Sequence, residues 1–139
     1  MELTKVFNNN VSAHLEKIEY NILETFDEKN LKVDIADQFK LNEISHNALA
    51  LTISRDIALG MVGGFTLHIE VDFKRYAQDG VNLENILSEE IVEQNITEIC
   101  GPVMNFVSLL ISQITASFNR NPIITTPNFI VKEPRKEKQ

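Results

Sequence analysis

The sequence predicts an α+β domain in which antiparallel strands are followed by helices that pack on the sheet. Apolar and polar residues alternate with a period of two through most of residues 33–73, and this pattern stops after Gly80. A helical period follows, and its longest stretch begins at Pro102. A period of two divides side chains between the faces of a strand, whereas a period of 3.6 gathers them on one side of a helix.

Length and composition fit one globular domain. The chain has 139 residues, of which 43% are hydrophobic and 24% charged, and a chain of this size buries roughly 70% of its unfolded surface. We expect one domain at residues 11–131, with an N-terminal tail at 1–10 and a charged tail at 132–139. The net charge of -7 argues against a protein that binds nucleic acid by neutralising phosphates. With one cysteine and no signal-peptide pattern, a cytoplasmic protein is expected.

The first apolar segment, residues 11–24, fits two structures. Leu15, Ile18 and Ile22 have helical spacing, whereas Ile18, Tyr20 and Ile22 alternate as in a strand. The residues alone leave both open. Three strands follow, and the clearest runs from Phe65 to Phe73. Gly60, Gly63 and Gly64 predict a tight hairpin loop before it, while residues 38–45 are expected to form a polar connection.

Two helices are predicted in the second half. Ser88 can cap a short acidic helix, and Pro102 fits the first turn of a longer one. The apolar stripe expected to pack on the sheet is Val103, Phe106, Val107, Leu110, Ile111, Ile114 and Phe118. Residues 99–119 carry no charge over about the length of a membrane span, but their polar residues and the lack of basic or aromatic flanks argue against insertion.

The opposite face of the long helix lacks the Lys and Glu of a solvent-facing helix. We expect it to be an interface between subunits, and the alternative is a helix buried inside one larger core. The residues predicted for this interface are Met104, Asn105, Ser108, Leu109, Ser112 and Gln113.

No constellation in the sequence is typical of an enzyme, so no catalytic residue, cofactor or metal is predicted. His14, His46 and His68 lack the spacing of a helix-borne zinc site. His68, Glu70 and Asp72 share one strand face and could bind a metal, but a solvated face is the preferred interpretation. Cys100 precedes a helix, and we interpret it as a small interior residue.

Apolar residues at expected loops and at the helix edge suggest a surface that accepts varied apolar chains. Flexible and aromatic side chains are frequent on such binding surfaces, although they could also cap the ends of the core. The residues predicted for a client-binding groove are Phe39, Leu41, Ile44, Met61, Val62 and Met104.

The order of elements, the Pro102 helix and the segment Pro127-Asn128-Phe129 resemble the SecB family of protein-export chaperones. The family has a Pro-x-Asn-Phe motif, whereas Pro127 here directly precedes Asn128. The resemblance implies that residues 11–24 form a strand, that a long connection crosses between the first two strands, and that the protein is a homotetramer, a dimer of dimers. It also implies an ATP-independent holdase that keeps unfolded precursors export-competent and passes them to SecA.

The resemblance further implies an acidic patch for SecA at Glu24, Glu70 and Asp72. Tyr20 stands where the family has a second acid, and Glu19 beside it is expected to face the other way. The C-terminal tail is basic where the family's tail is acidic. A divergent member could therefore serve a single client such as an antitoxin, and a non-catalytic structural or adaptor oligomer is the alternative class.

Overall fold

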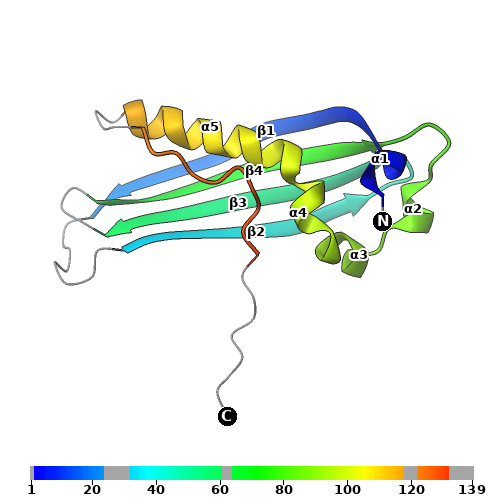
Figure 1. Cartoon of the computed structure of the whole chain (residues 1–139), viewed down its shortest axis with the longest axis horizontal. Coiled ribbons are helices and arrows are strands. Elements are labelled where there is room, and N and C mark those ends of the chain that lie inside the picture. Colours follow the sequence, from blue (N-terminus) through cyan, green and yellow to red (C-terminus); the bar gives the residue numbers. More distant parts are fainter. Residues whose placement is uncertain (1, 24–31, 61–63, 118–121, 132–139) are drawn as a thin grey trace, which may run out of the picture.

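The structure, a computed structural model, describes residues 2–23, 32–60, 64–117 and 122–131, with only the backbone at 32 and 33. Its elements are α1 (Leu3–Val6), β1 (Phe7–Ile22), β2 (Lys32–Ile44), β3 (Ala48–Gly60), β4 (Phe65–Ala77), α2 (Leu83–Ile86), α3 (Glu89–Gln94), α4 (Ile96–Ile99) and α5 (Gly101–Ser117). The predicted fold class is confirmed: four antiparallel strands precede the helices, and the longest helix packs on the sheet (Figure 1).

The strands form one sheet in the order β1-β4-β3-β2. The first two strands are therefore its two edges. The crossing connection that the resemblance implies between them falls at residues 24–31, outside the described residues. β3 and β4 pair as the predicted hairpin, although its loop at residues 61–63 lies outside the described residues. Both edge strands carry register shifts, at Phe7/Val11 and Leu15/Lys17 in β1 and at Leu41/Glu43 in β2. Such a shift bends an edge strand and disrupts its ladder locally.

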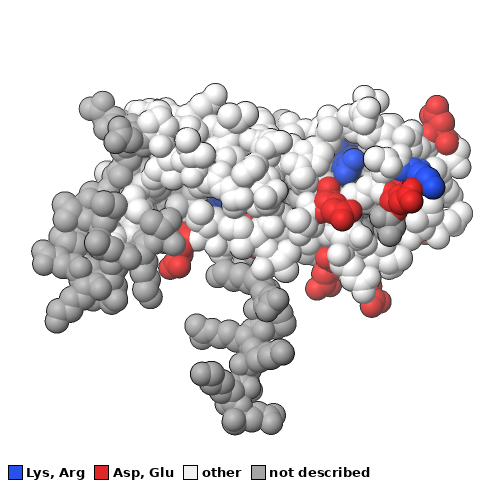
Figure 2. Space-filling model, viewed as in Figure 1, with Lys and Arg blue, Asp and Glu red and all other residues white. Residues whose placement is uncertain are grey.

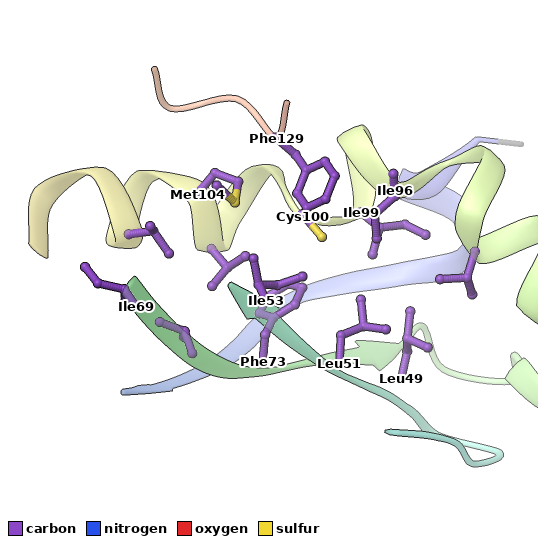
Figure 3. Close-up of a cluster of buried hydrophobic side chains, with 14 of the residues drawn as sticks. Leu49, Leu51, Ile53, Ile69, Phe73, Ile96, Ile99, Cys100, Met104 and Phe129 are labelled. Atoms are coloured by element: carbon purple, nitrogen blue, oxygen red, sulfur yellow. The ribbon is translucent and has the colours of Figure 1, made fainter. Parts of the chain in front are cut away.

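The two faces of the sheet differ as the alternation predicts. Phe65, Leu67, Ile69, Val71 and Phe73 are all buried, while the side chains between them face the open side. The apolar face is covered by α5 and by residues 122–131, which return beside the helix and cross β3 and β2 (Figure 1). Figure 3 shows the core between these layers.

The helices begin where the sequence supplies a cap. The Ser88 side chain accepts a hydrogen bond from the Ile91 amide, so α3 starts as predicted. Pro102 lies in the first turn of α5, where a proline costs no helical hydrogen bond. No helix in the described part of the chain is both long enough and apolar enough to span a bilayer.

Two boundaries expected from the sequence are wrong. Residues 1–10 include α1 and the start of β1, and Val6 and Phe7 join the core, so the domain begins well before residue 11. Residues 38–45, expected as a polar connection, belong largely to β2. β2 is an edge strand with one solvated face, which explains why its composition is polar. Residues 132–139 lie outside the described part.

Candidate functional site

An apolar groove runs along the β2 edge of the sheet. It lies between β2, helices α3 and α4, and residues 122–131, which we call the strap. Its volume is about 360 Å³. The lining residues, which define the edge groove, are Asp37, Gln38, Phe39, Glu93, Ile96, Phe129, Ile130 and Val131.

The floor of the edge groove is apolar and its rim is acidic. Phe39 meets Phe129 edge to face, with ring centroids 6.2 Å apart, and Ile96 is almost fully buried. Val131 leaves 57% of its surface exposed at the mouth of the groove. A neighbouring hollow of about 500 Å³ shares Glu93, Ile96 and Val131 and adds Glu90 to the rim. The site offers apolar contact area rather than a reactive group.

A buried ion pair joins the strap to the sheet beside this groove. Arg55 in β3 and Asp37 in β2 lie directly opposite each other, and both side chains are 0% exposed. Arg55 Nε and Nη2 donate to the two carboxylate oxygens of Asp37, each at 2.7 Å. The bidentate geometry fixes the guanidinium plane, so the remaining N–H groups point to a defined place.

The strap occupies that place. Arg55 Nη1 donates to the carbonyl of Thr126 at 2.7 Å and Nη2 donates to that of Asn128 at 2.9 Å. Nη1 also reaches the Thr125 hydroxyl at 3.0 Å, and the Ile130 amide donates to Asp37 at 2.8 Å. Sequence reasoning missed this cluster, although a cation within an otherwise apolar row was a signal that a buried acid must lie opposite.

The residues predicted for a client-binding groove do not lie together in the structure. Phe39 lines the edge groove, whereas Leu41 and Ile44 lie in β2 and pack partly buried against the core. Met104 is 0% exposed within the core, so its assignment to a groove and to an exposed interface was wrong. Met61 and Val62 lie outside the described residues.

The outward side of α5 carries three of the predicted interface residues. Asn105, Leu109 and Gln113 are exposed, Leu109 to 64%. Figure 2 shows that the surface over this helix is almost free of charged side chains. Ser108 and Ser112 are half-buried, and the Ser108 hydroxyl donates to the carbonyl of Thr125 in the strap at 2.8 Å. The chain itself therefore covers part of the uncharged face.

Carboxylates surround His68 on the open face of the sheet. Its Nδ1 lies 2.5 Å from Asp56 and its Nε2 lies 3.3 Å from Glu70. Desolvation lowers the pKa of His68, but the hydrogen bonds and charges of these two carboxylates outweigh it, so the pKa is raised above 6.5. A hollow of about 300 Å³ here is also lined by Glu19 and Asp34.

The acidic patch implied by the resemblance is only partly described. Glu70 and Asp72 lie on the open face, and Asp72 accepts a hydrogen bond from Thr52 at 2.8 Å, while Glu24 lies outside the described residues. Glu19 was expected to face the other way, but it stands opposite His68 on the open face and pairs with Lys17 at 2.9 Å. The mixed signs show that the face is not uniformly acidic.

Cys100 lies under the start of α5 with 0% exposure. Burial raises the pKa of its thiol to about 12, against the smaller opposing effect of Arg75. It has the environment of an interior residue, which is how the sequence was interpreted. Among the described residues, no three His, Cys, Asp or Glu side chains are placed to hold a metal ion.

Comparison with known proteins gives a structural match but no sequence match. The sequence matches no protein-family model and no curated protein. The fold is similar to that of a SecB-like chaperone of Mycobacterium tuberculosis, solved in complex with a ChAD peptide from the HigA1 antitoxin. That match has a TM-score of 0.63 and 11% identity, and it covers 89% of this chain and 88% of the other.

A protein of unknown function from Streptococcus agalactiae matches with a TM-score of 0.49 and 13% identity, over 84% of this chain and 97% of the other. Only the first of these two matches bears on the SecB-like fold that was expected from the sequence. With its strand order, its strand-then-helix arrangement and that match together, the chain has a SecB-like fold.

Proposed function

We propose that this protein is an ATP-independent holdase chaperone that binds apolar segments of non-native polypeptides. The observation that carries the proposal is the edge groove, an apolar surface at a sheet edge in a SecB-like fold. The M. tuberculosis protein of that fold was solved with a peptide from an antitoxin. An apolar groove gains free energy from any apolar segment that it removes from water, roughly 25 cal/mol per Å² of buried area.

The test is suppression of aggregation of an unrelated, chemically denatured protein at equimolar ratio without ATP. Suppression supports the holdase, whereas its absence favours a structural or adaptor oligomer. Val131→Asp places a charge at the mouth of the edge groove and should weaken suppression several-fold. Ile124→Asp is the matched control because Ile124 lies on the same strap, is 86% exposed and does not line the groove. Equal activity of the two variants would place client binding elsewhere.

Two kinds of client are compatible with the proposed holdase. A general export chaperone would bind many precursors in the cytoplasm and also a SecA-type partner, whereas a dedicated chaperone would bind a single client such as an antitoxin. The carboxylates Glu19, Asp56 and Glu70 on the open face would attract the basic zinc-bearing tail of such a partner. Glu70→Lys should therefore weaken partner binding and leave suppression of aggregation intact. The reverse result would mean that the two surfaces are assigned wrongly.

We further propose that copies of the chain associate through the outward side of α5. The resemblance to the SecB family implies such an assembly, because it implies a homotetramer. Leu109 is exposed there, and Ile18 and Ile22 on the helix-facing side of edge strand β1 are 43% and 68% exposed. Leu109→Glu would bury an unpaired charge in such an interface, which costs several kcal/mol. Light scattering should show a smaller species, whereas Ile86→Glu on α2, a site with 40% exposure, should keep the parent mass. An unchanged mass for Leu109→Glu would exclude this helix face from the interface.

A further inference from the structure

The strap has no regular secondary structure, yet side chains of the body hold its main chain. In α5, the Thr115 hydroxyl accepts a hydrogen bond from the Ile123 amide at 2.9 Å, and the Ser108 hydroxyl donates one to the Thr125 carbonyl at 2.8 Å. Arg55 donates hydrogen bonds to the carbonyls of Thr126 and Asn128, and Asp37 accepts one from the amide of Ile130. Main-chain bonds do not depend on the sequence of the strap, so this row of donors and acceptors could hold another extended chain equally well.

The side chains of the strap divide into anchors and exposed positions. Phe129 is 7% exposed and packs on Phe39, and Thr125 is 4% exposed, while Ile124 is 86% exposed. Pro127 and Asn128 are exposed as well. Main-chain hydrogen bonds with pockets for some of the side chains are the usual way in which a protein surface holds an extended peptide. The strap thus has the contacts of a bound peptide.

The polar side chains beneath the strap also hold one another in place. The side chains of Arg55 and Asp37 are each 0% exposed and fix one another through two bonds of 2.7 Å. The edge groove continues from this site, because it shares Asp37, Phe39 and Phe129 with it. A chain that enters the groove at Val131 would therefore meet the same row of polar groups that the strap now uses.

We propose that the strap is an internal occupant of a peptide-binding site and that a client segment displaces it. The inference rests on the proposed holdase function for the identity of the client. The displacing segment is extended, places a large apolar side chain where Phe129 now lies, and offers main-chain carbonyls to Arg55. If the strap is open in about 1% of molecules, it lowers the apparent affinity for a client about 100-fold. Weak segments would be excluded, and strongly apolar ones would be held.

The first experiment needs no natural client. A fluorescent peptide with the sequence of residues 122–131 is titrated into the full-length protein and into two variants. Phe129→Ala weakens the built-in strap, so the peptide should bind this variant at least about tenfold more tightly than the wild type. Ile124→Ala, at an exposed position of the same strap, should bind the peptide as the wild type does. Equal affinity for all three proteins, or no binding to any of them, would overturn the inference.

Phe129→Leu guards against a folding defect in Phe129→Ala, because it keeps an apolar side chain at this core position and leaves unchanged the groups of Arg55, Asp37 and Ser108 that would hold the peptide. We expect it to tighten peptide binding by a smaller factor, with a thermal unfolding curve that stays cooperative. No tightening in this folded variant would count against the inference.

The second experiment separates the inference from the proposed function. Hydrogen exchange of the Ile123 and Ile130 amides is followed with and without a denatured client. Displacement should speed their exchange while the amides of β3 and β4 keep their protection. If a client is bound and these two amides stay protected, the inference fails and the holdase stands. If no client is bound, the holdase fails, and the peptide titration alone decides whether the strap can be replaced.

Discussion

Asp37→Asn should strongly destabilise the protein, although it changes only one side-chain heavy atom. The carboxylate of Asp37 accepts two bonds from Arg55 and one from the Ile130 amide, at 2.7, 2.7 and 2.8 Å. Asparagine keeps the shape, but it removes the charge and replaces one acceptor by an amino donor. That donor must then face an N–H of Arg55 or of Ile130, and the guanidinium stays buried without its counter-charge.

Removal of one partner from a buried ion pair costs about 3–5 kcal/mol. The strap limits the loss, because it can lift and let water reach Arg55, so we expect about 3 kcal/mol. The total free energy of unfolding of a domain of this size is roughly 5–15 kcal/mol. In urea unfolding, the midpoint should fall strongly at a constant slope m. Asp34→Asn, on the same strand but exposed on the open face, should change the free energy of unfolding by less than about 0.5 kcal/mol. Equal midpoints for the two variants would refute this account of the pair.

Three further predictions concern His68, Cys100 and metal. The pKa of His68 is raised in the folded state, so its contribution to stability is complete below pH 6.5 and disappears as the pH rises through the raised pKa. Between about pH 6 and about pH 9, the wild type should therefore lose unfolding free energy relative to His68→Gln, and parallel curves would contradict this. Cys100, whose pKa is about 12 and whose side chain is fully buried, should react with a thiol reagent at about pH 8 only when urea unfolds the chain; fast labelling of the native protein would disprove its burial. The purified protein should contain no stoichiometric zinc, and a chelator should leave its Tm unchanged, whereas a drop in Tm would reveal a metal site.

The sequence predicted the central strands well and the edges poorly. One face is buried from Leu49 to Ile57 in β3 and from Phe65 to Phe73 in β4, so the alternation is regular over most of each strand. In β2 the row of Ile35 and Phe39 is interrupted by Asp37, and the strand has one solvated face. A polar edge strand and a polar connection have nearly the same composition, so the sequence alone did not separate them.

The candidate site was harder to predict because distant parts of the chain build it. Arg55 bonds Asp37 at a separation of 18 residues and Thr125 at a separation of 70, and no local period reports such pairs. Met104 was misplaced for a related reason. Only the stripe of α5 that faces the sheet was assigned to the core from the sequence. The strap also covers the flank of the helix that carries Ser108 and Thr115, so more of α5 is buried than the sheet alone would bury.

The Arg55–Asp37 pair also determines how β2 can be aligned with β3. A shift of the two strands by two residues would keep every apolar side chain on the covered face, so hydrophobic burial hardly opposes it. After such a shift Arg55 would lie opposite Ile35 or Phe39 instead of Asp37. A guanidinium would then be buried without a counter-charge, at a cost of several kcal/mol. One charged pair within an apolar row thus excludes the misaligned sheets that the alternating pattern would otherwise tolerate.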